Sequence, residues 1–204
     1  GKRVRVVRYV IIGNSAAGIG AVEKIRQLDK SGEITVISSE PHHTYSRPLI
    51  SYLLQGKTDE QRMKYRDDMF YERNKCTLLA GKTVTKIYPD KKCVELDDGK
   101  VISYDKLLVA TGSSAFLPPV EGLDTVAEKY TFMSLDDARK LQAALSKDKK
   151  VLILGAGLIG LKFAEGILDK VGEITVVDLA PRILSSILDD EGAGIVRSTW
   201  KARG

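Results

Sequence analysis

The chain has 204 residues, of which 43% are hydrophobic and 29% charged, and its formal net charge is +5. This composition is that of an ordinary soluble globular protein with enough apolar surface for a real core. The basic residues are scattered without interleaved aromatic residues and no apolar run is long enough to span a membrane, so we expect no nucleic-acid or membrane partner and a cytoplasmic location.

The first elements in chain order form a βαβ unit. The apolar run Val4–Ile12 predicts a strand, Ala17–Asp29 a helix and Ile34–Ser38 a second strand. The polar, proline-containing segment from Glu40 to Lys57 is too long for a simple turn, and ordered loops of this length are usually functional. A helix is expected within Met63–Asn74.

The middle of the chain predicts a small antiparallel meander, followed by a second βαβ unit. Its short alternating stretches are Cys76–Ala80, Thr83–Tyr88, Lys92–Leu96 and Val101–Ser103. Then come a strand at Lys106–Ala110, a linker at Phe116–Gly122, the second unit from about Lys149, and a helix over Leu184–Arg203. We therefore predict an α/β fold with two Rossmann-like, three-layer ββα nucleotide-binding units and an inserted antiparallel β-meander. The expected domains are residues 1–118 and 119–204.

Two glycine-rich turns carry the functional signal. One reads Gly13-Asn14-Ser15-Ala16-Ala17-Gly18 and the other Gly155-Ala156-Gly157-Leu158-Ile159-Gly160. The pentapeptide Gly-Glu-Ile-Thr-Val follows each helix, at 32–36 and 172–176. Such turns let backbone amides and a helix N-terminus approach a pyrophosphate. An acid follows each second strand, Glu40 and Asp178, and could accept hydrogen bonds from ribose hydroxyls. Two dinucleotide sites are therefore expected, although Ser15 replaces the middle glycine of the first.

The residues resemble the pyridine nucleotide-disulfide oxidoreductase superfamily. The resemblance adds three segments to the two turns: Tyr45-Ser46-Arg47-Pro48-Leu49-Ile50-Ser51, Leu107-Leu108-Val109-Ala110-Thr111-Gly112 and Ala180-Pro181-Arg182-Ile183-Leu184. The first of these is similar to the branch that contains rubredoxin reductases, NADH oxidases, CoA-disulfide reductases and the flavin parts of nitrite reductases. Members are flavoproteins with FAD in the first site and NAD(P)H in the second.

The resemblance implies roles for individual residues. Those expected at the FAD are Gly13, Ser15, Ala16, Ala17 and Gly18 around the pyrophosphate, Glu40 on the ribose, Arg47 and Pro48 along the cofactor, Val84 at the adenine, and Ala110, Thr111 and Gly112 closing the site. Those expected at NAD(P)H are Gly155, Gly157, Leu158, Ile159, Gly160 and Asp178. A carboxylate at 178 favours the ribose diol of NADH over the 2′-phosphate of NADPH, whereas Arg182 could act in the opposite direction.

Thiol and metal chemistry are not expected. Disulfide-type members place a cysteine in the segment that is Thr44–Tyr52 here, and this sequence has none there. Direct hydride transfer from NADH to FAD, and on to an outside acceptor, is therefore the simpler mechanism. Cys76 and Cys93 are expected to be structural, and the two histidines, His42 and His43, have no partners at metal-ligand spacing.

Two departures from the family pattern are linked in one hypothesis. Relatives similar to rubredoxin and ferredoxin reductases carry a lysine and a glutamate near the flavin where this chain has Tyr52 and Lys162. We expect Lys162 either to supply the missing cation and so raise the flavin potential, or to turn outward on its helix.

The sequence after Asp178 lacks the third strand of a mononucleotide half, so we expect the N-terminal part of a longer flavoenzyme or a small subunit completed by a partner chain, a homodimer being possible. The electron acceptor is expected to be rubredoxin, ferredoxin, a fused redox module, a metal centre or oxygen. Two alternatives stay open: a CoA-disulfide or polysulfide reductase with its thiol elsewhere, and a non-catalytic FAD- and NADH-binding scaffold resembling apoptosis-inducing-factor relatives.

Overall fold

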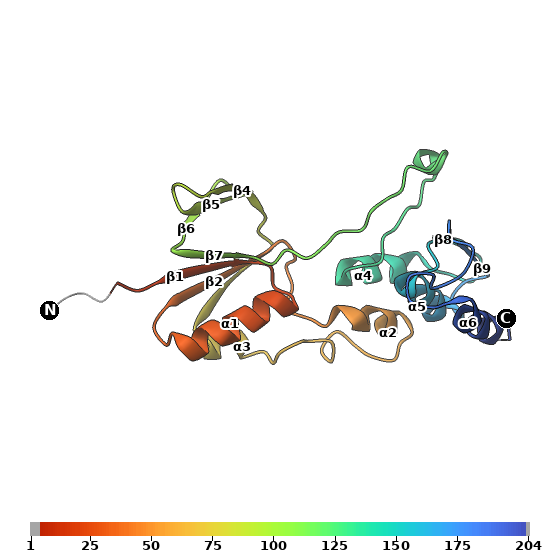
Figure 1. Cartoon of the computed structure of the whole chain (residues 1–204), viewed down its shortest axis with the longest axis horizontal. Coiled ribbons are helices and arrows are strands. Elements are labelled where there is room, and N and C mark those ends of the chain that lie inside the picture. Colours follow the sequence, from red (N-terminus) through yellow and green to blue (C-terminus); the bar gives the residue numbers. More distant parts are fainter. Residues whose placement is uncertain (1–4, 203–204) are drawn as a thin grey trace. The chain divides into compact units, whose positions relative to one another are not determined.

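The structure, a computed structural model, describes residues 5–202 and divides them into two compact units (Figure 1). The first unit consists of residues 5–46 and 63–114, and the second of residues 47–62 and 115–202. The segment 47–62 thus packs with the C-terminal half of the chain. The predicted boundary between residues 118 and 119 concerns cofactor domains and stays a prediction.

A parallel sheet organises the first unit. Its strand order is β3 (Cys76–Ala80), β2 (Glu33–Ser38), β1 (Arg8–Ile12) and β7 (Lys106–Val109). Helix α1 (Ala16–Leu28) forms the crossover between β1 and β2, as expected for parallel neighbours. The prediction that residues 76–80 belong to the meander is wrong, because β3 pairs in parallel with β2.

Two layers cover this sheet (Figure 1). Strands β4 (Val84–Tyr88), β5 (Cys93–Leu96) and β6 (Val101–Ser103) form an antiparallel sheet. Successive residues of β1 point to opposite faces, so Val10 packs in the core that contains Val94 of β5, and Ile11 in the core that contains Ile19 of α1. Helix α3 (Phe70–Arg73) adds Phe70 to the second core. The three-layer ββα arrangement is confirmed.

The second unit contains the second βαβ motif. Strands β8 (Lys150–Leu154) and β9 (Glu173–Val177) pair in parallel and are joined by α5 (Leu158–Ile167). The other elements are η1 (Arg47–Leu49), α2 (Ile50–Leu54), η2 (Leu123–Thr125), α4 (Leu135–Ala144) and α6 (Asp190–Lys201). Leu54 is fully buried in the same core as Phe163 of α5. A Cβ atom on Gly166 would lie 3.4 Å from that of Leu54, so glycine lets α2 approach α5 closely.

Some predicted boundaries differ from the structure. The first strand begins at Arg8, and Val4 lies outside the described residues. The last helix begins at Asp190, because Leu184 has a φ of 51° and is part of a turn; Arg203 also lies outside the described residues. Helix α4 was not predicted, although Ser134 and Asp137 form a capping box at its start.

An acidic residue ties the start of β1 to the turn before β7. The Asp105 carboxylate accepts hydrogen bonds from the backbone amide and the guanidinium of Arg8, and it also pairs with Arg5 at 2.7 Å. These contacts, the Arg8 hydrogen bond first, lower the pKa of Asp105 to about 2. The folded-state pKa is thus below that of the unfolded chain, about 3.9.

The stabilisation from Asp105 should therefore be complete above about pH 4 and be lost as the pH falls through about 2. We expect the melting temperature of Asp105→Asn to be below that of the wild type at pH 6, and the difference to shrink toward pH 2. Thermal unfolding followed by circular dichroism at both pH values measures it. A difference that does not change with pH would contradict the argument.

Among residues 5–202, no helix combines the length and the apolar character that a membrane span requires.

Candidate functional site

The two glycine turns have the same backbone geometry. After β1, the amide of Gly13 donates to the carbonyl of Ile37 at 2.9 Å; after β8, the amide of Gly155 donates to that of Val177 at 2.7 Å. Gly13 has a φ of 123° and Gly155 a φ of 116°, values that residues other than glycine rarely adopt. The repeat read from the sequence is therefore a repeat in structure.

The last glycine of each turn permits close packing of the helix on the turn. A Cβ atom on Gly18 would lie 2.1 Å from the carbonyl oxygen of Gly13, and one on Gly160 would lie 2.1 Å from that of Gly155. Neither position can hold a larger residue unless the backbone moves. Both helices consequently begin directly beside the strand that precedes them.

The helices that follow these turns lack side-chain caps. Ser15 and Gly157 are the N-cap residues of α1 and α5, and neither makes a side-chain cap hydrogen bond. By contrast, Ser134 caps α4 and Asp189 caps α6. The first amides of a helix need acceptors, so both turns leave donors and partial positive charge for an anionic group. A Cβ atom on Gly157 would meet nothing within 4 Å, so the space beside this helix start is open to an anionic group.

The two acids do not occupy equivalent positions. Asp178 comes directly after Val177, the residue that bonds Gly155, whereas Glu40 comes three residues after Ile37, the residue that bonds Gly13. The Asp178 carboxylate accepts the amides of Ala156 and Ala180, each at 2.7 Å. These hydrogen bonds lower the pKa of Asp178. Asp178 therefore holds the glycine turn in addition to its predicted role at the ribose.

Glu40 is held by Tyr45, the first residue of the segment Tyr45–Ser51 that carries the family resemblance. The hydroxyl of Tyr45, which is buried, donates to the Glu40 carboxylate at 2.5 Å. The sequence pattern included Tyr45 but gave no reason to pair it with Glu40. The structure thus fixes the direction of the carboxylate that is predicted to meet a ribose.

The remaining predicted FAD residues fall into three places. Ala110 contacts the first turn, since its amide donates to the Ile12 carbonyl at 2.8 Å and its oxygen lies 2.0 Å from where a Gly13 Cβ would be. Thr111 and Gly112 follow it, and Val84 begins β4. Arg47 and Pro48 belong to the second unit, where Arg47 donates to the Met133 carbonyl at 3.3 Å.

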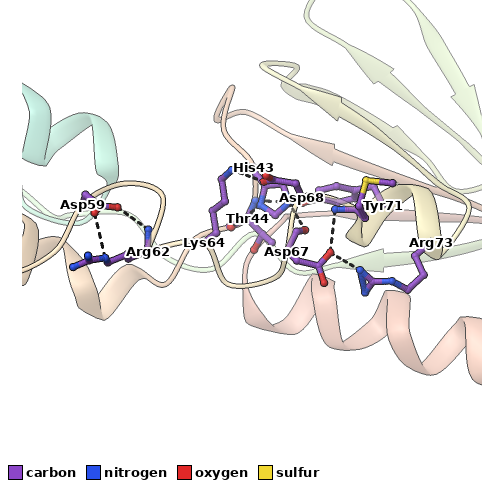
Figure 2. A network of polar contacts seen from close by, with 10 residues as sticks. His43, Thr44, Asp59, Arg62, Lys64, Asp67, Asp68, Tyr71 and Arg73 are labelled. Carbon is purple, nitrogen blue, oxygen red and sulfur yellow. Dashed lines mark hydrogen bonds and ion pairs between the residues drawn. The ribbon is translucent and has the colours of Figure 1, made fainter.

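A polar network beside the first turn was missed by sequence reasoning. The Asn14 carboxamide accepts from the hydroxyl of Tyr71 at 2.5 Å, and that hydroxyl accepts the amide of Thr44 at 3.3 Å. Figure 2 shows Tyr71 beside Thr44 and His43, whose ring lies edge-on to Tyr71 with centroids 5.2 Å apart. Tyr71 is 57 residues from Asn14, so no local pattern could have predicted the pair.

The second unit has a cavity of about 310 Å³ beside Asp178. Arg182, Arg197 and Trp200 are among the residues that line it. The guanidinium of Arg182, however, donates to the Leu188 carbonyl at 3.0 Å and pairs with Asp190 at 3.2 Å. Arg182 is therefore engaged in holding the loop before α6.

Lys162 and Tyr52, the two residues of the hypothesis on the flavin potential, lie together in the second unit. The Lys162 ammonium is 5.7 Å from the centre of the Tyr52 ring and 3.1 Å from the Glu165 carboxylate. Its side chain is 44% exposed, so the contact coexists with access to solvent. Leu158 and Ile159, in the first turn of the same helix, are exposed, as residues that contact a cofactor would be.

Both cysteines lie in strands, β3 and β5, and neither forms a disulfide. Burial raises the pKa of Cys76 to about 11, so its thiol stays protonated at neutral pH. Residues 5–202 contain no cluster of three or more His, Cys, Asp or Glu side chains that could hold a metal ion.

A family model described as pyridine nucleotide-disulphide oxidoreductase matches residues 7–204, nearly the whole chain. The chain belongs to this family. Membership confirms the resemblance inferred from the glycine turns and the three additional segments. It also explains why two turns of one geometry lie on a single polypeptide.

Relatives within the family include reductases and oxidases that use NADH. The chain is 34% identical to the epsilon subunit of NADH-dependent phenylglyoxylate dehydrogenase from Aromatoleum evansii, covering 100% of this chain and 48% of that protein. It is 34% identical to nitrite reductase [NAD(P)H] from Bacillus subtilis, covering 97% of this chain and 24% of that protein. The chain thus spans half or less of these relatives.

A solved structure supports the same assignment. The putidaredoxin reductase in its covalent complex with putidaredoxin is 25% identical, with a TM-score of 0.87, and the match covers 96% of this chain and 48% of that one. The α/β architecture with its inserted antiparallel sheet is therefore that of the family.

Proposed function

We propose that this chain is the nucleotide-binding part of an FAD-dependent NADH oxidoreductase that transfers a hydride from NADH to FAD and passes the electrons to a separate acceptor. The observation that carries the proposal is the pair of equivalent turns, each followed by a helix without a side-chain cap. FAD, when bound, supplies the chemistry that links a two-electron donor to the acceptor.

The first turn is the proposed FAD site. Gly13 and Gly18 bring the backbone amides at the start of α1 to the pyrophosphate, and Glu40, directed by Tyr45, holds the adenosine ribose. Ser15 has the same cap position as Gly157 and adds a hydroxyl, a group that can donate a hydrogen bond to a phosphate. Val84, Ala110, Thr111 and Gly112 of the same unit complete the proposed site. The roles of Arg47 and Pro48 along the cofactor stay predictions.

The second turn is the proposed NADH site. Gly155, Gly157 and Gly160 shape the cradle, and Leu158 and Ile159 lie exposed beside it. The pKa of Asp178 is lowered, so its carboxylate is ionised at neutral pH. This charge would repel a 2′-phosphate and accept hydrogen bonds from a ribose diol. Arg182 is held by Leu188 and Asp190. Both observations support the proposed preference for NADH over NADPH.

The acceptor is proposed to be a small redox protein, a metal centre or oxygen. One relative is a subunit of a larger NADH-dependent dehydrogenase, and one solved relative is joined to putidaredoxin. The segment Thr44–Tyr52 has no cysteine to relay electrons through a thiol. A partner subunit, a fused redox module or a second copy of the protein would complete the assembly.

The direct test uses the natural full-length protein. It should be yellow as isolated, and stoichiometric NADH under anaerobic conditions should bleach the flavin absorbance near 450 nm, with NADPH markedly slower. A colourless preparation that takes up no FAD and gives no heat with NADH in calorimetry would refute the proposal.

Lys162 is proposed to tune the flavin. A cation near the flavin stabilises its anionic reduced form, and Glu165 at 3.1 Å partly offsets that charge. We expect Lys162→Met to lower the flavin potential by about 30 mV, equivalent to about 1.4 kcal/mol for two electrons. Glu165→Gln should change it in the opposite direction. Dye-linked reductive titration measures both, and two unchanged potentials would remove the hypothesis.

A further inference from the structure

The first turn contains a polar side chain whose carboxamide group makes two hydrogen bonds. Asn14 lies between Gly13, with its φ of 123°, and Ser15, the cap residue of α1. Asn14 is only 9% exposed. Its amide nitrogen donates to the His42 carbonyl at 3.4 Å, and its oxygen accepts from the Tyr71 hydroxyl at 2.5 Å. The shape of this turn therefore depends on groups outside it.

Tyr71 connects that turn to a second segment. Its hydroxyl donates to Asn14 and accepts the Thr44 amide at 3.3 Å (Figure 2). One oxygen atom therefore joins the turn after β1 to the loop after β2. His43 packs edge-on against the ring and contacts the Thr44 and Asp67 carbonyls at 2.9 and 3.1 Å. Burial raises the pKa of Tyr71, which keeps the hydroxyl protonated as a donor.

The second turn is held by a different group. The residue equivalent to Asn14 is Ala156, which has no polar side chain, and its backbone amide bonds the Asp178 carboxylate. The residue equivalent to Asp178 in the first unit is Ser38, which follows Ile37. The first turn is thus held by the neutral side chains of Asn14 and Tyr71, whereas the second turn is held by the Asp178 carboxylate.

From these contacts we infer that Tyr71 is a positioning residue for FAD: through Asn14 it fixes the backbone of the first turn, and so the α1 amides that meet the pyrophosphate. The inference rests on the proposed function, because it requires FAD at this turn. Tyr71 itself acts through Asn14, and its ring packs against Phe70 and His43.

Tyr71→Phe removes the hydroxyl and keeps the ring. In the natural full-length protein, we expect the dissociation constant for FAD to rise about tenfold, the effect of one lost hydrogen bond on an immobilised group. The ³¹P NMR signals of bound FAD should shift, because its phosphates contact the misplaced amides. In Asn14→Ala, the further change Tyr71→Phe should have little additional effect, since the link is already cut.

Tyr9→Phe is the matched control. Tyr9 lies in the same unit near the start of β1, the end away from the turn, and its hydroxyl donates to Asp29 at 3.0 Å. This variant should lose stability but keep the FAD affinity within about twofold and the phosphorus signals unchanged.

The outcomes separate the inference from the proposed function. A wild-type protein that binds no FAD refutes both. A wild-type protein that binds FAD, with Tyr71→Phe equal to it in affinity and phosphorus signals, overturns the inference alone. Equal losses of affinity in Tyr71→Phe and Tyr9→Phe would also overturn it, because they would show a general effect of stability.

Discussion

Replacing Gly18 by alanine is expected to destabilise the protein by about 3 kcal/mol and to abolish FAD retention. The new Cβ atom would lie 2.1 Å from the Gly13 carbonyl oxygen and 3.0 Å from its carbon. Both are backbone atoms of a turn that is itself fixed by the Gly13 to Ile37 hydrogen bond, so the clash cannot be relieved by a side-chain rotation. Helix α1 would have to move away from β1. Chemical denaturation and FAD titration measure the two effects.

Gly20 provides the matched control in the same helix. A Cβ atom at that position would meet no heavy atom within 4 Å. Gly20→Ala should therefore raise the stability by about 0.5–1 kcal/mol through helix propensity alone and leave FAD binding unchanged. If Gly18→Ala behaved like Gly20→Ala, the close approach of helix and turn would not be what the site requires.

The second large effect is expected at Gly157, with opposite signs for stability and binding. Gly157 is the N-cap of α5 with a φ of −78°, and a side chain there would enter open space. In Gly157→Asp the carboxylate should cap the helix and add about 0.3 kcal/mol of stability, because glycine is itself a tolerated N-cap residue. The same charge would lie in the proposed pyrophosphate cradle, so the affinity for NADH should fall about 100-fold.

Gly157→Ser is the control for this experiment, because serine already occupies the equivalent position in the first turn. Its stability should stay close to that of the wild type, since Ser15 makes no cap hydrogen bond in the first turn, and it should keep most of the affinity for NADH, measured by calorimetry. FAD binding should be unchanged in both variants. An aspartate variant that binds NADH like the wild type would show that the start of α5 is not the pyrophosphate site.

The strand–turn–helix units were predictable because their signal is local. An apolar strand, a glycine that needs a positive φ and an apolar helix lie within about 20 residues, and the structure has them at β1 and α1 and again at β8 and α5. The partner of each strand was harder to predict from the sequence. Residues 76–80 alternate like a meander strand, but their partner is Ile34–Ser38, some 42 positions earlier. Alternation identifies a strand without identifying its neighbour.

In the candidate site, too, local features were predictable from the sequence and long-range contacts were not. Gly13, Gly18, Gly155 and Gly160 follow from spacing. The structure confirms close packing at Gly13, Gly18 and Gly160, and a positive φ at Gly13 and Gly155. The groups that orient the polar residues come from distant segments: Tyr71 at Asn14, and Ala156 at Asp178. The capping box at Ser134 was a readable local signal for α4. The roles of the predicted residues toward FAD and NADH stay predictions.

The route of the chain between its two compact units has a practical consequence for protein engineering. Because residues 47–62 belong with 115–202, the polypeptide passes from one unit to the other at 46–47, 62–63 and 114–115. An excised module that starts at Ala115 would lack α2 and lose Leu54, whose side chain is fully buried against that module's core. Neither unit is a contiguous segment, so severing any single junction leaves the remaining two as covalent tethers. Domain exchange with relatives will succeed only if the segment 47–62 is transferred together with the C-terminal half.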